Sequence, residues 1–174
     1  MTVKKLTLTA ILTALALALG LLERFLPISL LIPLPGVKLG LSNIVTLSAL
    51  CVLGTPYAAA ILLLRAVLGS VFSGSVTSLL YSLAGGALAL TAMAIASRSK
   101  RLSVYGVSMI GAAMHSIGQI LAAMAVIGSV SIVSYLPLLL VISAVTGALT
   151  GAATGGVLVG WDAYRKRMPS GGSL

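Results

Sequence analysis

Residues 102–161 read LSVYGVSMIGAAMHSIGQILAAMAVIGSVSIVSYLPLLLVISAVTGALTGAATGGVLVGW and contain no aspartate, glutamate, lysine or arginine. A helix needs roughly 20 apolar residues to cross the hydrocarbon core of a bilayer, so this stretch can cross it twice. Its apolar residues follow one another without the polar residue at every second position that a transmembrane strand would need. The stretch therefore predicts membrane-spanning helices.

Three further uncharged stretches, 6–22, 39–64 and 66–97, extend this pattern over most of the chain. Of the 174 residues, 59% are hydrophobic and only 7% are charged, a balance that soluble domains do not have. We predict an all-α membrane protein that forms a single integral membrane domain over residues 1–174.

Turn signals divide these stretches into a bundle of six spans. Gly54–Pro56, Ser73–Ser75 and the polar hinge Gly128–Ser134 interrupt the apolar runs. The first run could instead belong to a cleaved signal peptide, but it is longer than the usual apolar region of roughly 7 to 15 residues, so we favour a span. The predicted spans are 6–22, 40–53, 57–72, 76–97, 106–127 and 135–161, followed by a tail at 165–174.

The positive charges predict the topology. With six spans, all three basic clusters fall on one side of the membrane, and the positive-inside rule makes that side cytoplasmic. Both termini, including the tail, are then cytoplasmic, in a multi-pass protein of a prokaryotic cell membrane. Most of the net charge of +9 has this topological role, so we expect no nucleic-acid partner. The clusters are Lys4–Lys5, Arg98–Arg101 and Arg165–Arg167.

Several kinds of chemistry lack the residues they need. The only carboxylates are Glu23 and Asp162, which excludes a carboxylate pair or an Asp-rich magnesium site. No G-x-x-x-x-G-K-[ST] motif is present, so the chain has no P-loop for ATP. The single cysteine, Cys51, excludes an internal disulfide, and we expect it to be a small buried residue. We predict a protein that is not an enzyme and that holds no metal or cofactor.

Two rows of small residues, an alanine row on the first span and a glycine row on the last, repeat at every fourth position. Small side chains in such a row let another helix approach closely. Packing inside the bundle explains either row. The first row lies on the first span, which is at the edge of many bundles, so it could instead dock a partner protein; we expect the glycine row to pack inside. The rows are Ala10, Ala14 and Ala18, and Gly147, Gly151 and Gly155.

Polar side chains at membrane depth are expensive and therefore suggest function. We expect Arg65, near the middle of the third span, to be offset by an anionic ligand or by serine and carbonyl oxygens, since Glu23 and Asp162 should lie at opposite membrane edges; a structural buried arginine is the alternative. His115 and Gln119 lie one helical turn apart on one face and can read the donors and acceptors of a substrate. No second ligand at metal spacing accompanies His115.

The segment from Glu23 to Gly40 carries three prolines and should be a structured outer loop. With Lys38 in this loop and Asn43 at the mouth of the second span, it could close over a pocket. Tyr81 on the fourth span could line the same cavity. The candidate substrate-binding residues are Lys38, Asn43, Arg65, Tyr81, His115 and Gln119.

Three stretches resemble the family of Gx transporters, also labelled heptaprenyl diphosphate synthase component I. They are residues 32–44 (IPLPGVKLGLSNI), 65–70 (RAVLGS) and 113–119 (AMHSIGQ), where the family pattern has asparagine in place of Ser116. More generally, the size, the expected topology, the alanine row and the outer loop resemble the substrate-binding S components of energy-coupling factor (ECF) vitamin transporters.

The resemblance implies a substrate-binding subunit for a small nutrient or a cofactor or isoprenoid precursor. It implies that Ala10, Ala14 and Ala18 meet a membrane scaffold subunit that carries two ATPases, and that the ligand lies toward the outer face. A non-catalytic membrane accessory of a heptaprenyl diphosphate synthase or of a quinone pathway is the alternative. An autonomous secondary transporter is a third reading, disfavoured by the lack of an internal repeat and of an intramembrane carboxylate.

Overall fold

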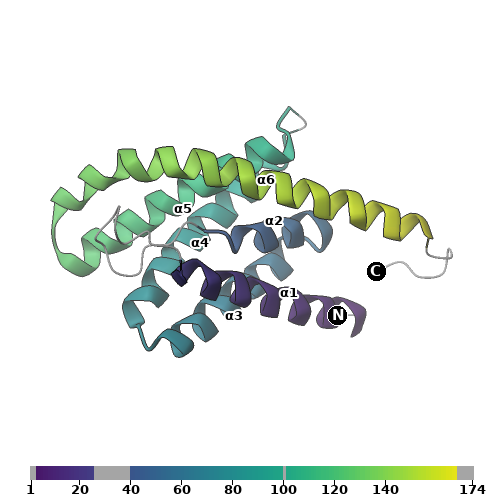
Figure 1. Cartoon of the computed structure of the whole chain (residues 1–174), viewed down its shortest axis with the longest axis horizontal. Helices are drawn as coiled ribbons and strands as arrows, with labels where there is room; N and C mark the ends of the chain where they lie inside the picture. Colours follow the sequence, from purple (N-terminus) through teal and green to yellow (C-terminus); the bar gives the residue numbers. More distant parts are fainter. Residues whose placement is uncertain (1–2, 26–39, 100, 168–174) are drawn as a thin grey trace.

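The computed structural model describes residues 3–25, 40–99 and 101–167, and of Arg24 only the backbone. Every regular element in these residues is helical, which confirms the all-α prediction for them (Figure 1). The elements are α1 (Val3–Leu22), η1 (Glu23–Phe25), α2 (Asn43–Val52), α3 (Thr55–Ser73), α4 (Val76–Ala96), α5 (Val104–Ile127), η3 (Val130–Tyr135) and α6 (Leu136–Arg167).

Five of the helices are long and apolar enough to cross a membrane, and α2, with 10 residues, is the short one. The chain is thus a multi-pass helical membrane protein, while six complete crossings remain a prediction. The α6 helix continues to Arg167, beyond the predicted end of the last span at residue 161. No glycine or proline interrupts the chain between Trp161 and Arg167, so nothing ends the helix at the expected membrane edge.

The breaks read from the sequence are real helix ends. Gly74 and Gly128 end α3 and α5 with φ of 61° and 71°, a left-handed conformation that glycine adopts without steric cost. Ser75 and Ser103 begin α4 and α5, and each side chain accepts a hydrogen bond from a backbone N–H of the first turn.

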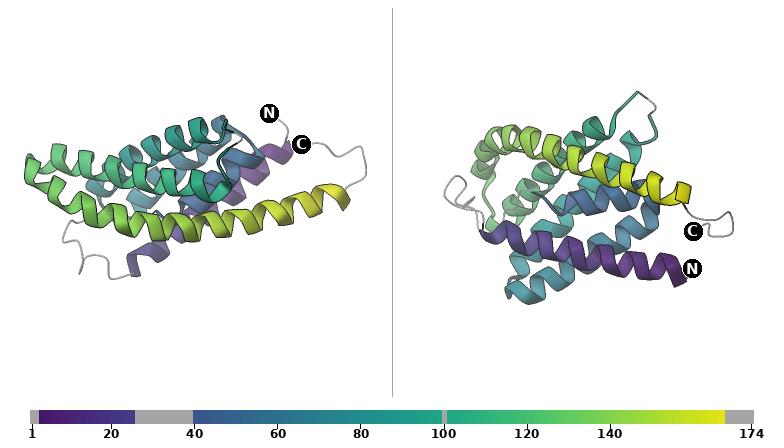
Figure 2. Two further views of the ribbon diagram at one scale, coloured as in Figure 1. Left: turned by 90° about the horizontal axis from the view of Figure 1, so that it is seen from above. Right: turned by 45° about the vertical axis from the view of Figure 1, so that its right-hand side comes forward.

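The short α2 helix lies in the middle of the bundle and contacts each of the other five helices. Most of its residues are buried, among them Asn43 at its first turn. By contrast, α1 lies at the edge, where it packs on α3 and α2 (Figures 1 and 2). On the other side of the molecule, α4, α5 and α6 pack in chain order.

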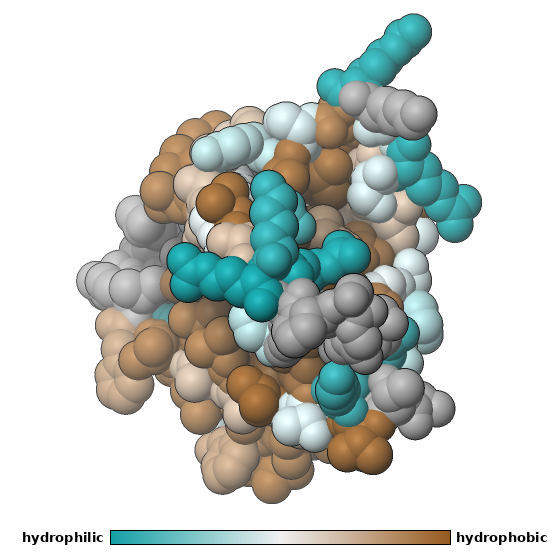
Figure 3. All heavy atoms as spheres, turned by 90° about the vertical axis from the view of Figure 1, so that its right-hand side faces the viewer, coloured by the Kyte–Doolittle hydropathy of each residue, from teal (hydrophilic) through white to brown (hydrophobic). Residues whose placement is uncertain are grey.

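The start of α1 and the C-terminal end of α6 lie on the same side of the molecule (Figure 2). Seen from that end, long hydrophilic side chains gather on it and apolar surface surrounds them (Figure 3). Arg98 and Arg101, in the connection between α4 and α5, are exposed. This arrangement agrees with the charge pattern behind the predicted topology. Which end faces the cytoplasm stays a prediction.

Glycine and hydroxyl side chains join α5 to α6. A Cβ added to Gly147 would lie 2.7 Å from Met109 Cα, and one added to Gly151 would lie 2.9 Å from Tyr105 Cα. Next to these contacts, the Ser108 hydroxyl is 2.6 Å from that of Thr150. The expectation that the glycine row packs inside is confirmed for Gly147 and Gly151. It is wrong for Gly155, where an added Cβ would meet nothing within 4 Å.

The alanine row faces away from the rest of the chain. Ala10, Ala14 and Ala18 are exposed, while the opposite face of α1 buries Thr9, Thr13 and Ala16. The row therefore does not pack against the described helices of this chain, and docking of a partner remains a prediction. Cys51 is also exposed, which corrects the expectation that it is buried. The reason is that Cys51, in the last turn of α2, lies on a side that the other helices leave uncovered, while Leu50 and Leu53 beside it are buried.

Candidate functional site

A buried polar group forms where the start of α2 meets α5. Gly40 has φ of 84°, and a Cβ there would lie 2.9 Å from Asn43 Nδ2 and 3.2 Å from His115 Cδ2. Only glycine fits this position, because any larger residue would be strained and would also collide with both side chains. Gly40 thus allows the entry to α2 to pack directly against His115.

His115 and Gln119 form the pair that their spacing predicts. Their Nε2 atoms are 2.7 Å apart, and both side chains are almost completely buried. Room for them comes from α4, because a Cβ on Gly85 would lie 2.8 Å from the His115 carbonyl oxygen and 3.0 Å from Gln119 Cγ. The close approach of α4 therefore holds the pair against the entry to α2.

Asn43 has open hydrogen-bonding capacity. It is 6% exposed, and neither Nδ2 nor Oδ1 has a hydrogen-bond partner in the described part of the chain. Buried amides in proteins are nearly always hydrogen-bonded, so an open donor and an open acceptor together indicate a bound molecule or water. The Asn43 side chain can therefore form two hydrogen bonds to a ligand that presents an acceptor next to a donor.

Glu23 is inside the molecule and near Arg65, which corrects the expectation that it is out of reach of Arg65; its depth in the membrane stays a prediction. Its side chain is 2% exposed, and its Oε1 accepts a hydrogen bond from the Leu41 backbone N–H at 2.9 Å. It is also close enough for its negative charge to stabilise the Arg65 guanidinium. Glu23 is held there because η1 follows α1 without a break and its hydrogen bond to Leu41 ties it to the residues just before α2.

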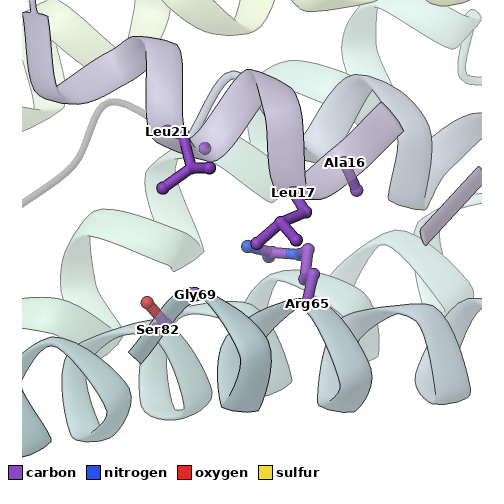
Figure 4. Close-up of a pocket in the computed structure, with 7 residues that line it drawn as sticks. Ala16, Leu17, Leu21, Arg65, Gly69 and Ser82 are labelled. Atoms are coloured by element: carbon purple, nitrogen blue, oxygen red, sulfur yellow. The ribbon is translucent and has the colours of Figure 1, made fainter. Parts of the chain in front are cut away.

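Arg65 lies in a pocket between α1, α3 and α4 (Figure 4). It is 7% exposed, and its Nε and Nη2 are buried without a hydrogen-bond partner in the described residues. Glu23 connects this pocket to the Asn43 group, because Leu41 directly follows Gly40. The lining residues are Ala16, Leu17, Gly20, Leu21, Arg65, Gly69 and Ser82.

The remaining candidates lie apart from these groups. Tyr81 is 1% exposed in an apolar cluster with Ile120 and Leu139, although its hydroxyl has no partner among the described residues. Lys38 lies outside the described residues. Ser116 faces α6, where its hydroxyl is 2.6 Å from that of Ser143. The structure thus groups Asn43, His115 and Gln119, and joins Arg65 to them through Glu23.

Two contributors were not among the candidates read from the sequence: Glu23 as a neighbour of Arg65, and Gly40 as the contact to His115. The signal for Glu23 was its rarity, since it is one of only two carboxylates. In the described residues, no three His, Cys, Asp or Glu side chains gather as metal ligands would. The site therefore offers hydrogen bonds and one positive charge beside one negative charge.

These features define a helical multi-pass membrane protein with buried polar groups between its helices. Residues 12–157 match the family described as Heptaprenyl diphosphate synthase component I, also called Gx transporter. The match covers well over half of the chain, so the protein belongs to this family, as its three sequence stretches predicted. No curated protein and no solved structure matches the chain.

Proposed function

We propose that this protein is the membrane-embedded substrate-binding component of an ECF-type importer. It captures a small nutrient, or a cofactor or isoprenoid precursor, that carries an anionic group. It delivers this substrate from outside by docking on an ATP-driven scaffold. The observation that carries the proposal is the buried Asn43 amide, whose donor and acceptor are both open beside His115 and Gln119.

The polar residues suit selective binding rather than catalysis. An enclosed site with a few placed polar groups in an apolar surrounding is typical of small-molecule recognition. Asn43 supplies a donor and an acceptor, and Arg65 supplies a positive charge whose hydrogen-bonding positions are open. A ligand that lacks the matching groups would leave them unpaired, and this penalty gives selectivity.

Energy for uptake would come from a partner. The chain has no P-loop of its own, so ATP would be hydrolysed by two ATPase subunits bound to a membrane scaffold subunit. The exposed alanine row on α1 supports docking, because small side chains let a partner helix approach closely.

A second candidate is a non-catalytic membrane accessory of a heptaprenyl diphosphate synthase. The description of the family favours it. A catalytic role in such a synthase is disfavoured, since Asp162 is exposed near the end of α6 and only Glu23 lies at the site. In this case the exposed face of α1 would bind a synthase subunit.

The two candidates differ in what stays bound to the protein. The tagged protein is purified from its native host in mild detergent, and mass spectrometry identifies the accompanying proteins and any metabolite released on denaturation. A scaffold subunit with two ATPases, together with a released metabolite, supports the importer. A prenyl synthase subunit without a metabolite supports the accessory role instead.

The binding site is tested by the amount of metabolite that each purified variant retains. For Asn43→Ala and His115→Ala we expect a loss of about tenfold or more, since each removes a buried hydrogen-bonding group. Thr91→Ala, an exposed position on α4, is the control and should retain the metabolite. Unchanged retention in both site variants would remove the Asn43 group from the site.

Docking is tested on the exposed face of α1. Ala14→Leu should abolish co-purification of the scaffold and leave metabolite retention intact, because a bulky side chain prevents close helix approach. Leu15→Phe enlarges a neighbouring exposed side chain by the same number of carbon atoms and should leave assembly unchanged. Assembly that survives Ala14→Leu would contradict docking through the alanine row.

A further inference from the structure

The last turns of α6 extend beyond the rest of the bundle. Thr154 is the last buried residue of the helix, and its hydroxyl donates a hydrogen bond to the Ile44 carbonyl of α2 at 3.4 Å. In the segment 155–167, here called the α6 arm, no residue is buried. A Cβ added to Gly156 or Gly160 would meet nothing within 4 Å. The arm also projects past the neighbouring helices (Figure 1), so the described helices do not cover it.

The side chains of the α6 arm change character in a fixed order along the helix. Val157 and Val159 are exposed, and Trp161 and Tyr164 follow, with their ring centroids 5.7 Å apart. The next three residues, Arg165–Arg167, are exposed cations. In membrane helices apolar side chains face the hydrocarbon, tryptophan and tyrosine lie at the interface, and cations lie outside it. The arm therefore has the order of side chains that a helix presents where it leaves a bilayer.

The length of α6 places these cations in the headgroup layer. With 32 residues, the helix is about 48 Å long, whereas the hydrocarbon core of a bilayer is roughly 30 Å thick. At a usual tilt of about 20°, α6 still exceeds the core by roughly 15 Å. Its first turn, residues 136–139, is apolar and uncharged, so the excess falls at the basic end.

Further cations lie at the same end of the molecule, on separate elements. Lys4 on α1 is exposed, as are Arg98 and Arg101 in the connection between α4 and α5. Seen from this end, the hydrophilic side chains are spread over the face, with apolar surface around them (Figure 3). The chain has only two carboxylates, of which Asp162 is exposed at this end and Glu23 is buried. The described part of this end is therefore strongly positive.

The surroundings of the cations favour a lipid surface over an acidic protein as their partner. Exposed apolar residues lie directly beside them in the chain, Val3 beside Lys4 and Leu102 beside Arg101. A bilayer offers anionic headgroups on every side of the protein, immediately next to hydrocarbon. An acidic protein would offer its charge on one side only, and it would leave the other cations without a partner.

We propose that this basic end binds anionic phospholipids, and that Arg165, Lys166 and Arg167 of the α6 arm hold their phosphate groups. The guanidinium fork of arginine matches two oxygens of a phosphate, and the lysine adds a further charge. A headgroup with a net negative charge, as in phosphatidylglycerol, is the chemical class that fits. The inference goes beyond the proposed function and does not rest on it, since an importer component and a synthase accessory could both hold such lipids.

The test uses the full-length protein in nanodiscs of phosphatidylcholine that contain a minor fraction of one brominated lipid. Bromine quenches tryptophan on contact, and Trp161 is the only tryptophan of the chain, so quenching measures how often that lipid lies beside the α6 arm. Brominated phosphatidylglycerol is expected to associate more strongly than brominated phosphatidylcholine. The ratio should lie between about fivefold, the effect of one cation, and about 100-fold for three. High salt should reduce it.

Variants then locate the binding on the arm. The triple variant Arg165→Gln, Lys166→Gln and Arg167→Gln should lower the preference for phosphatidylglycerol at least fivefold, toward that for phosphatidylcholine. The matched control, Arg165→Lys with Arg167→Lys, keeps the charge and should retain most of the preference. Because the arm lies outside the packed bundle, both variants should keep the midpoint of thermal unfolding of the unsubstituted protein in pure phosphatidylcholine.

Three results would overturn the proposal. Equal quenching by the two brominated lipids in the unsubstituted protein would leave an acidic partner protein as the occupant of the arm. An unchanged preference in the triple variant, at an unchanged midpoint, would place the lipid elsewhere. A saturable change of Trp161 emission on adding inorganic phosphate to nanodiscs of pure phosphatidylcholine would make a free phosphate the ligand. No scaffold, synthase or nutrient is present, so each result is separate from the outcome for the proposed function.

Discussion

The helices pack differently in the two halves of the molecule, which are α4, α5 and α6 on one side and α1 and α3 on the other. Between α4, α5 and α6, glycines bring backbones into contact: a Cβ on Gly118 would lie 2.6 Å from the Ala84 carbonyl oxygen, and one on Gly147 would lie 2.7 Å from Met109 Cα. Between α1 and α3, side chains separate the helices, and a Cβ on Gly69 would make an ordinary 3.7 Å contact with Leu17 Cδ1. The first arrangement brings backbones into direct contact, whereas the second leaves the Arg65 pocket.

This difference explains where the polar groups lie. His115 and Gln119 are on the closely packed side, where Gly85 and Gly118 hold α4 against α5 and fix their positions. Arg65 is on the looser side, beneath a helix that contacts few others. A site between a rigid half and a more loosely packed half can keep its geometry on one side while a ligand enters on the other.

The largest effect is expected where backbone meets backbone. Gly118→Ala would place a methyl group against the Ala84 carbonyl and Gly85 Cα, and no side-chain rotation can relieve the clash. We expect a loss of about 3 kcal/mol in the free energy of unfolding, at the upper end of overpacking effects. Reversible unfolding in detergent, followed by circular dichroism, measures this loss.

The matched control is Gly111→Ala on the same helix. There the added methyl group meets Met93 Cγ and Sδ, the flexible part of a side chain that can rotate away. The loss should be no more than about 1 kcal/mol. Equal losses in the two variants would show that α4 and α5 are not in backbone contact at Gly118.

The helices and their ends were largely predictable. Uncharged length and the turn signals at Gly54, Gly74 and Gly128 located the apolar helices, because these signals act over a few neighbouring residues. The spacing of His115 and Gln119 also predicted their contact, since one helical turn separates them. Local rules therefore suffice wherever the interacting residues belong to one helix.

The predictions that were wrong concerned contacts between segments far apart in the sequence. Glu23 was expected to be out of reach of Arg65, yet it accepts a hydrogen bond from the Leu41 backbone N–H and lies close to the charge of Arg65. No periodic pattern links a residue at the end of one helix to an arginine in the middle of another. The exposure of Cys51 failed similarly, because it depends on which neighbours cover the end of α2. Such contacts come from tertiary packing, which local patterns in a single sequence do not show.

A smaller effect is expected for the hydroxyl pairs on the closely packed side. Ser116→Ala removes the 2.6 Å contact to Ser143 between α5 and α6. Ser143 also donates to the Leu139 carbonyl within its own helix, so it keeps a partner. We expect a loss of about 0.6 kcal/mol, the average for hydrogen bonds between membrane helices. The same unfolding assay applies, with Ser97→Ala at an exposed position as the control.

A loss near 3 kcal/mol in Ser116→Ala would contradict this expectation, since that value belongs to broken backbone packing. It would mean that the hydroxyl pair, rather than the glycines, holds α5 to α6. The double variant with Ser143→Ala separates the two explanations, because a true pair gives less than additive losses.

The smallest effect, and of opposite sign, is expected between α1 and α3. Gly69 lies inside a helix, where alanine is intrinsically preferred by roughly 0.5 to 1 kcal/mol. An added methyl group meets Leu17 at an ordinary contact distance, so the packing against α1 does not oppose that preference. Gly69→Ala should therefore raise the free energy of unfolding by about 0.5 kcal/mol. A loss of stability would show instead that α1 lies against α3 as closely as α4 lies against α5, and the contrast between the halves would disappear.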